Sequence, residues 1–415
     1  MAVVQAGQRP DGFAFDIGFL MNICIITSSY PARTDDIVQA PFLIDFIGGL
    51  KRRGHHVFVF TQDRPETKEE FLEGVHVKWF SWMSSKRPLV RLNPINPLDL
   101  FLIGSLIHSG QVQLLPFVKE NKIEVCLALW VLPGGYFANH TYRKTGIPYS
   151  VWALGSDIYR YGRTPLLSRI MKRVIQDARG VFGDGFDLSK RVEERFGRPC
   201  SFLATTRTIS SVLPLQREDT PLQRPMMTPA GQGEATGTAY RFLFVGRLEK
   251  VKGIDVLLDS MSLLSAEGLN VHLTVVGKGG MEEWAKNFVL QKGLERKVSM
   301  VGTLSDPELA LLYASADCVV IPSRSESIPL VFSEAIRFDK ELIVTDVGDM
   351  GMLGRSYGAA GVVPTEDAVA LKEMMKEKVK SEGRDRPREG MEKREELKRL
   401  FNIETSVERF LADYE

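Results

Sequence analysis

The chain has 415 residues, a length that suits two domains of about 200 residues each. Hydrophobic residues make up 44% of it and charged residues 25%, an ordinary globular composition that argues against a disordered, collagen-like or disulfide-rich protein. The net charge of +1 gives no general attraction to nucleic acid, so we expect no nucleic-acid partner, and only a local basic patch remains open.

The cysteines are scattered along the chain and do not have the spacing of metal ligands. Three of them lie in apolar runs, so we expect buried free thiols and a reducing, cytoplasmic compartment. The four positions are Cys24, Cys126, Cys200 and Cys318.

Residues 1–20 precede the first convincing strand. They lack a basic start followed by a continuous apolar core, so we do not expect a secretory signal and interpret them as a loosely attached extension. The chain also lacks a continuous apolar run of about 18 residues, and the sequence therefore predicts no transmembrane helix.

The first half opens with a strand–helix–strand pattern. The pattern predicts a buried strand at 22–27, a helix at 42–53 ended by Gly54, and a second strand at 56–61. A unit of this length makes a parallel, doubly wound sheet, and ligands bind in the crevice at the carboxyl ends of such strands.

Two later segments combine apolar and basic residues. Residues 82–110 place a basic stretch before an apolar one at 100–107, which favours an amphipathic helix packed on the sheet and also suits a peripheral membrane surface or a lipid-linked molecule. A predicted helix at 163–179 carries Arg169 and Arg173, which form either a solvated face or a contact with acidic lipid.

Two further strands end in turns that are rich in small residues. A buried run at 125–132 leads into Pro133-Gly134-Gly135, and a strand at 149–154 ends at Gly155-Ser156-Asp157. Asp157 would either cap the following helix or face a ligand.

Residues 213–238 are rich in Pro, Gly, Thr, Gln and Ser and cannot bury a core. We interpret them as an interdomain connection, with the domain boundary near residue 210. A strand at 241–245 then opens a second domain and is followed by Gly246-Arg247-Leu248-Glu249-Lys250-Val251-Lys252-Gly253 and a helix at 254–264.

The most informative stretch is 319–335. A buried strand at 318–321 leads through a turn with Glu326 to a helix that we expect to begin near Ser327 or Ile328, with Pro329 in its first turn. The free N–H groups of a helix start favour an anion. Glu334 lies about 8 Å further along this helix at roughly 1.5 Å per residue.

Taken together, these motifs resemble family four of the retaining glycosyltransferases, also called group 1 glycosyltransferases. The resemblance implies the GT-B fold, an α/β architecture of two Rossmann-like domains with doubly wound parallel sheets facing a central cleft. It divides the chain into an extension (1–20), an acceptor domain (21–210), a linker (211–240), a nucleotide-sugar domain (241–400) and a final helix that packs back on the first domain (401–415).

The resemblance also implies the roles of single residues. Arg247 and Lys252 would bind the donor diphosphate and stabilise its growing charge without a metal or other cofactor. Glu334 would accept hydrogen bonds from the ribose, and Glu326 would contact sugar hydroxyls or stabilise positive charge at the anomeric carbon. The remaining expected donor-side residues are Gly246, Gly277, Thr303, Leu304, Ile328, Pro329, Leu330 and Val331, and those on the acceptor or sugar side are Asp157 and Gly134.

Two departures from the family pattern keep alternatives open. Leu154 stands where many members have a histidine, and Gln39-Ala40-Pro41 stands where many have glycines. A catalytically inactive nucleotide-sugar-binding homologue that acts as a partner or regulator is therefore a second hypothesis, and an epimerase is a third. The leading hypothesis is sugar transfer to a glycan, lipid-linked or small-molecule acceptor, in the cytoplasm or at the inner face of the membrane.

Overall fold

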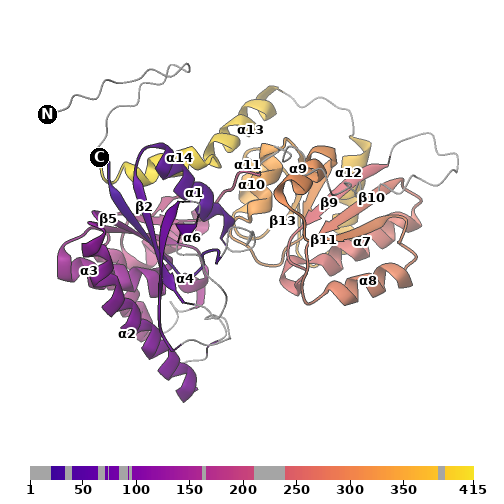
Figure 1. The fold of residues 1–415 in the computed structure, drawn as a ribbon. Helices are drawn as coiled ribbons and strands as arrows, with labels where there is room; N and C mark the ends of the chain where they lie inside the picture. The colour runs from indigo at the N-terminus through magenta and orange to yellow at the C-terminus, as the bar shows by residue number, and fades with distance from the viewer. Residues whose placement is uncertain are drawn as a thin grey trace, which may run out of the picture.

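The computed structural model describes residues 20–32, 40–63, 71–72, 74–83, 92, 96–160, 165–209, 239–381 and 388–415. These residues form two α/β domains that lie side by side, with the last two helices running across the top of both (Figure 1). The altered Gln39-Ala40-Pro41 position lies partly outside the described residues, as do most of the predicted extension and linker.

The first domain is built on an eight-stranded sheet in the order β3-β4-β2-β1-β5-β6-β7-β8. All its pairs are parallel except β3 with β4. Its strands are short apolar runs, as the sequence predicts for a sheet covered on both faces. They are β1 (Asn22–Thr27), β2 (His56–Gln62), β3 (Phe71–Leu72), β4 (Val75–Phe80), β5 (Val125–Leu129), β6 (Tyr149–Ala153), β7 (Val181–Gly183) and β8 (Ser201–Phe202).

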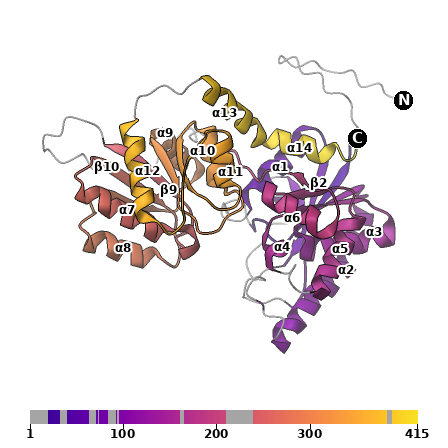
Figure 2. The ribbon, with the colours of Figure 1, turned by 180° about the vertical axis from the view of Figure 1, so that it is seen from behind.

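Helices cover both faces of this sheet. One face packs on α2, α3, α5 and α6, and Figure 2 shows α2, α3 and α5 together on that side. On the other face, Trp152 is buried against Phe42 and Phe46 of α1, with ring centroids 5.4 and 5.3 Å apart. The helices are α1 (Pro41–Arg52), α2 (Pro97–Glu120), α3 (Tyr136–Thr145), α4 (Ser156–Arg160), α5 (Pro165–Asp177) and α6 (Phe186–Phe196).

The second domain repeats this plan with a six-stranded, all-parallel sheet in the order β11-β10-β9-β12-β13-β14. The change of direction in the strand order, between β9 and β12, marks the crevice where such sheets bind ligands. Its strands are β9 (Tyr240–Val245), β10 (Val271–Val276), β11 (Val298–Gly302), β12 (Cys318–Ile321), β13 (Glu341–Thr345) and β14 (Gly361–Val363). Its helices are η3 (Lys250–Lys252), α7 (Ile254–Ala266), α8 (Glu282–Gln291), α9 (Asp306–Ser315), α10 (Leu330–Arg337), α11 (Met350–Ser356) and α12 (Ala368–Lys380).

The carboxy-terminal helices α13 (Arg388–Leu400) and α14 (Ile403–Leu411) connect the two domains a second time. The high charge of 377–399 predicts a solvated helical region, but α13 packs on α10. Leu397 is fully buried there, and Arg394 donates a hydrogen bond to the carbonyl of Lys340 at 2.5 Å. The region is helical and most described side chains of α13 are at least partly exposed, as predicted, but one face is buried because backbone carbonyls satisfy the long side chain of Arg394.

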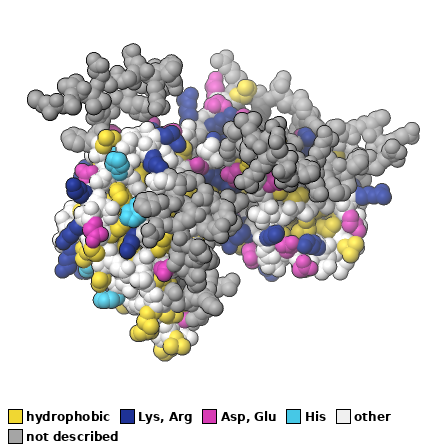
Figure 3. Space-filling model, in the orientation of Figure 1, with side chains coloured by type: hydrophobic (Ala, Val, Ile, Leu, Met, Phe, Trp, Pro, Cys, Tyr) yellow, Lys and Arg dark blue, Asp and Glu magenta, His cyan; other side chains and the backbone are white. Residues whose placement is uncertain are grey.

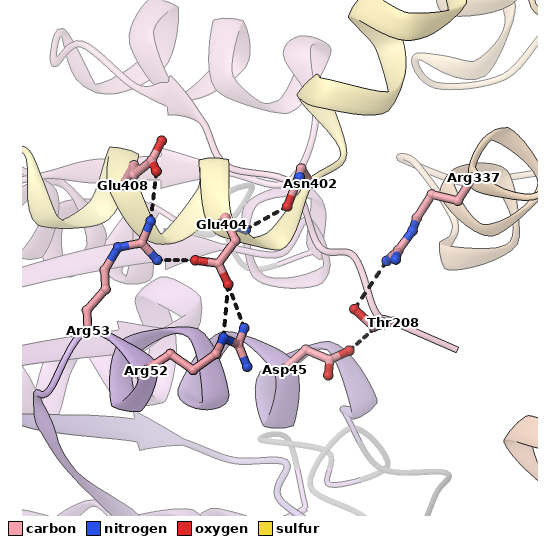
Figure 4. Close-up of polar contacts among 8 residues, drawn as sticks. All are labelled: Asp45, Arg52, Arg53, Thr208, Arg337, Asn402, Glu404 and Glu408. Atoms are coloured by element: carbon pink, nitrogen blue, oxygen red, sulfur yellow. Dashed lines mark hydrogen bonds and ion pairs between the residues drawn. The ribbon is translucent and has the colours of Figure 1, made fainter. Parts of the chain in front are cut away.

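The last helix, α14, lies against α1 of the first domain. Phe410 packs on Phe46 at 5.8 Å between ring centroids. Glu404 pairs with both Arg52 and Arg53, and its neighbour Glu408 pairs with Arg53 at 2.7 Å (Figure 4). Apolar contacts and ion pairs together therefore hold the end of the chain on the first domain.

Helix α2 is longer than the sequence predicts. Asn96 caps it by accepting a hydrogen bond from the Leu98 N–H at 3.0 Å, and Pro97 occupies its first turn. It passes the length and composition criteria for a candidate membrane span, which the core helices of soluble proteins also pass, so it does not overturn the expectation of no transmembrane helix. Its second half packs on the sheet through Phe117 and Val118. Its first turns carry exposed apolar side chains, which gather at the lower end of the molecule in Figure 3.

All four cysteines are buried and free, as expected. Burial raises the pKa of the Cys200 thiol to about 12, which makes it unreactive. These residues belong to the cores of the two domains, and their packing gives them no part in a site.

Candidate active site

The carboxyl-end loops of the two sheets meet between the domains. Asp184 follows β7 in the first domain, and Ser327 follows β12 in the second. The hydroxyl of Ser327 donates a hydrogen bond of 3.2 Å to Asp184. Because all loops at the carboxyl end of a parallel sheet share one edge, this contact places the crevices of the two sheets opposite each other.

Lys252 and Glu326 come together in the second domain. Lys252 lies at the end of η3, and its ammonium group forms an ion pair with the Glu326 carboxylate. The hydroxyl of Ser323 also donates to that carboxylate at 3.1 Å. Both charged side chains are mostly buried, with 21% and 14% of their surface exposed, so the pair is only weakly screened by solvent.

A glycine makes this approach possible. Gly253 has a left-handed backbone, with φ of 70°, and a Cβ placed on it would lie 2.0 Å from the carbonyl oxygen of Pro322. No other residue type fits there without displacing the strand end. The loop after β9 therefore rests directly on the end of β12 and brings Lys252 to Glu326.

Helix α10 begins later than the sequence predicts. Its first residue is Leu330, and Pro329 is an N-cap with extended backbone rather than a first-turn residue. Pro329 has no N–H group, and no side chain among the described residues caps the helix, so the amides of Leu330 and Val331 are available to an anion. The Phe332 N–H donates to the Pro329 carbonyl at 2.9 Å. Ile328 is buried beneath this end, whereas Pro329, Leu330 and Val331 are partly exposed.

Glu334 lies inside the protein in this structure. Only 2% of its surface is exposed. One carboxylate oxygen accepts a hydrogen bond from Arg207 at 2.6 Å and the other accepts from the Tyr313 hydroxyl at 2.5 Å. Arg207 also pairs with Asp306, at the start of α9, at 3.2 Å. In this conformation Arg207 and Tyr313 occupy the two oxygens that the resemblance assigns to the ribose.

The electrostatics of this cluster agree with its geometry. Burial would lower the pKa of Arg207, but the charge of Glu334 and the hydrogen bond to it raise the pKa instead. Burial, followed by the negative charge of Glu334, raises the pKa of Tyr313 well above its usual value. The Tyr313 hydroxyl therefore stays protonated and donates a hydrogen bond to the Glu334 carboxylate.

The other expected donor-side residues line neighbouring loops. A Cβ on Gly277 would lie 1.9 Å from the carbonyl oxygen of Gly246, so the loops after β9 and β10 touch. Arg247 is exposed beside them, Thr303 is exposed after β11, and Leu304 is half-buried. The structure brings Lys252 and Glu326 into contact and leaves the Arg247 side chain directed to solvent.

On the first domain, the expected acceptor-side residues are tightly packed. Gly134 is buried, and a Cβ there would lie 2.5 Å from the Leu129 carbonyl oxygen. Asp157 lies within α4, and its carboxylate accepts the Val131 N–H at 2.5 Å, so it anchors the turn after β5. Its other oxygen, Oδ1, is buried without a partner among the described residues. Leu154 packs on the core beneath this turn.

Asp349 contributes a second contact between the domains. It lies in the loop after β13 and accepts the Asp187 N–H at the start of α6 at 3.0 Å. The N-cap of α6 is Gly185, which has no side chain to cap the helix, and a Cβ there would lie 2.5 Å from the Asp349 carboxylate. A carboxylate from one domain therefore caps a helix of the other.

Near the contact between the two domains, burial raises the pKa of two aspartate side chains. Burial and then the charges of Asp157 and Asp349 raise the pKa of Asp184 to about 7, although the hydrogen bond from Ser327 opposes the shift. Burial raises the pKa of Asp157 to about 6 against the effect of backbone N–H donors. A carboxyl group that titrates near neutral pH suits proton transfer.

Sequence reasoning missed four of these residues: Asp184, Arg207, Asp306 and Tyr313. The sequence does contain a feature that could have identified Asp184 as a site residue. It directly follows a short apolar strand, as Asp157 nearly does. Arg207 has a weaker one, as a single cation in the apolar and threonine-rich segment before the linker. The partners of Tyr313 and Asp306 depend on tertiary packing.

Residues 231–398 match the family model of glycosyl transferases group 1. This match covers almost the whole of the second domain. An O-antigen chain mannosyltransferase from Escherichia coli is 27% identical over 223 residues, which cover 52% of this chain and 58% of that protein. An uncharacterized glycosyltransferase from Methanocaldococcus jannaschii is 37% identical over 108 residues, 26% of this chain and 27% of that protein. The chain thus spans only part of the length of these relatives.

Solved structures show that the fold extends over both domains. A glycosyltransferase from Rickettsia africae has a TM-score of 0.66 at 14% identity and covers 95% of this chain and 98% of its own. Anabaena HepE in complex with UDP has a TM-score of 0.67 at 14% identity, covering 95% and 99%. The two domains together therefore have the GT-B fold, as the sequence predicts.

Proposed function

We propose that this chain is a retaining, metal-independent glycosyltransferase of family four that moves a sugar from a nucleoside-diphosphate sugar to an acceptor. The observation that carries the proposal is the Lys252–Glu326 pair beside the uncapped start of α10, within a domain that matches the group 1 family. A cation next to free helix N–H groups is suited to a diphosphate, and a carboxylate beside it is suited to a sugar.

The donor would lie across the crevice of the second domain. Its diphosphate would approach the Leu330 end of α10, with Lys252 and Arg247 as cations. Both amide dipoles and cations stabilise the charge that the diphosphate gains as the glycosidic bond breaks, and this stabilisation is greater where water is excluded. Glu326 would then turn from Lys252 toward the sugar hydroxyls or the developing positive charge.

The acceptor would enter from the first domain. We propose a glycan, lipid-linked or small-molecule acceptor and an enzyme at work in the cytoplasm or at the inner face of a membrane. Support comes from the buried free thiols, from the exposed apolar start of α2, and from relatives with names in O-antigen synthesis.

The test is a thermal-shift screen with UDP-, GDP- and ADP-sugars, followed by turnover assays with those that bind. A ligand that binds only the folded state raises its apparent stability. We expect one nucleotide class to raise the midpoint and to support transfer. Binding without turnover over a broad acceptor panel would favour the inactive homologue, and no binding of any sugar nucleotide would overturn the proposal.

A further inference from the structure

A groove lies on the outer surface of the first domain, between three of the helices that cover one face of its sheet. Helices α2, α3 and α5 lie together there (Figure 2) and border a cavity of about 290 Å³. Pockets for small molecules usually measure roughly 300–1,000 Å³, so this cavity suits a small ligand. Its basic residues come from two of the helices and are Arg143, Arg169 and Arg173.

The helical repeat of the sequence places polar side chains along this groove. Arg169 and Arg173 are one turn apart on α5 and therefore project from the same face. Gly110 lets α2 approach α3 closely, because a Cβ on it would lie 2.6 Å from the ring of Phe137. The lining residues of α3 recur at helical spacing and are Tyr136, Asn139, His140 and Arg143.

The floor of the groove is fixed to the amino end of β6. The buried amide of Asn139 donates hydrogen bonds of 2.9 Å to the Tyr149 hydroxyl and to Asp177. The Tyr149 hydroxyl donates in turn to the Val174 carbonyl at 2.6 Å. Tyr149 is the first residue of β6, whereas the crevice lies beyond the carboxyl end of the same strand. The groove is therefore separate from the proposed donor site.

The charges around the groove favour an anion. Arg169 and Arg173 are exposed and have no ion-pair partner among the described residues. Arg143 pairs with Asp177 at 2.9 Å. Burial opposes ionisation of Asp177, but hydrogen bonds from Asn139 and Arg143 lower its pKa, so this carboxylate is already neutralised. No acidic residue lines the groove in the part of the chain that the structure describes. Unpaired guanidinium groups beside one small cavity are suited to the oxygens of a phosphate.

Exposed apolar side chains lie at the starts of the same helices. Leu98 and Phe101 of α2 are 73% and 59% exposed, and Leu166 of α5 is 67% exposed. Gln111, which lines the groove, lies about 15 Å further along α2 than Phe101 at roughly 1.5 Å per residue. An apolar surface near a basic one is typical of a contact with acidic lipid. The phosphate therefore has two possible carriers, a lipid headgroup and a small soluble molecule.

We propose that the groove between α2, α3 and α5 binds a phosphate group, with Arg169 and Arg173 as its main ligands. The inference does not depend on the proposed function, because the groove and the crevice lie at opposite ends of β6. A lipid carrier would hold the first domain at a membrane surface, whereas a soluble phosphate ester would occupy the groove as a small ligand.

The test uses the full chain and the double variant Arg169→Gln/Arg173→Gln. The control is Lys144→Gln/Lys172→Gln, which removes the same charge from exposed positions on α3 and α5 that do not line the groove. Binding is measured by flotation with phosphatidylcholine vesicles, with and without phosphatidylglycerol, and by calorimetric titration with glycerol 3-phosphate. Thermal midpoints check that both variants are folded, as we expect for changes to exposed side chains.

Binding of wild type to the acidic vesicles in preference to the neutral ones identifies a lipid carrier, and binding to glycerol 3-phosphate alone identifies a soluble one. In either case we expect Arg169→Gln/Arg173→Gln to weaken binding about 25-fold, at roughly fivefold for each basic residue, and the control to weaken it by about fivefold or less. Equal effects of the two double variants would overturn the inference. So would wild type that binds neither glycerol 3-phosphate nor acidic vesicles more tightly than neutral ones.

Discussion

The Nε atom of Arg207 lies 2.6 Å from a carboxylate oxygen of Glu334, and this pair joins the connection between the domains to the nucleotide-side helix α10. Glu334 is 2% exposed in its side chain and Arg207 is 13% exposed. The other oxygen of Glu334 binds Tyr313, so the carboxylate is fully satisfied by protein groups. The residue that sequence reasoning assigns to the ribose therefore also ties the two domains together.

Loss of Arg207 should destabilise the fold. Arg207→Ala leaves the Glu334 carboxylate buried without its cation, which costs about 3 kcal/mol when one partner of a buried pair is removed. Chemical denaturation followed by circular dichroism measures this loss. Arg355→Ala removes an exposed pair with Asp346 and should change stability little, so equal effects of the two variants would contradict the role of burial.

Loss of Lys252 should act on catalysis. Lys252→Ala removes the cation beside Glu326, and we expect kcat to fall on the order of 100-fold, about 3 kcal/mol of transition-state stabilisation. Steady-state kinetics with the donor found by thermal shift gives the value. Lys286→Ala, which breaks an exposed pair within α8, serves as control. Unchanged turnover in Lys252→Ala would remove this residue from the site.

Glu334 should matter more for nucleotide binding than for chemistry. In Glu334→Gln the hydrogen bonds to Arg207 and Tyr313 weaken and the ribose loses a charged acceptor, so we expect the Kd for the nucleotide to rise about tenfold. Calorimetry on the folded variant measures this change, with kcat followed in parallel. A large fall in kcat at an unchanged Kd would show that Glu334 has a different role.

Gly253 should be intolerant of a side chain. Gly253→Ala meets both a left-handed backbone and a carbonyl 2.0 Å away, so we expect a loss of more than about 2 kcal/mol and a displaced Lys252. Gly268→Ala is the matched control, because it has φ of 75° but nothing within 4 Å of its Cβ. Its loss should be about 1 kcal/mol, from backbone strain alone. Equal losses would show that the loops do not need this close approach.

Turnover should not depend on a divalent metal. The proposed site neutralises the diphosphate with Lys252, Arg247 and helix amides, so we expect activity in excess EDTA to match that in added magnesium. A complete loss that magnesium or manganese restores would contradict this prediction.

Most of the parallel strands were predictable because they are short apolar runs followed by a glycine or a polar turn, but β4 and β8 were not predicted. The bounds of β1 and β12 agree with the sequence prediction to the residue. Helix α10 was placed too early, because Pro329 is equally suited to an N-cap and to a first turn. Lys252 and Glu326 were assigned to the site from motif resemblance, but their pairing was not predicted. The Arg207–Glu334 and Asp184–Ser327 contacts join residues 127 and 143 apart in sequence. No local sequence pattern predicts contacts between residues so far apart in the chain.

The chain passes between the domains twice, once near Thr208 and once between α13 and α14. Thr208 contacts Asp45 of the first domain and Arg337 of the second, and Asn402 caps the start of α14 (Figure 4). Two neighbouring crossings define an axis, so we infer that an opening of the Asp184–Ser327 and Asp187–Asp349 contacts would take place by rotation about it. A truncation that removes α14 would leave a single connection between the domains. We then expect the two crevices to lose their alignment while each domain keeps most of its own stability.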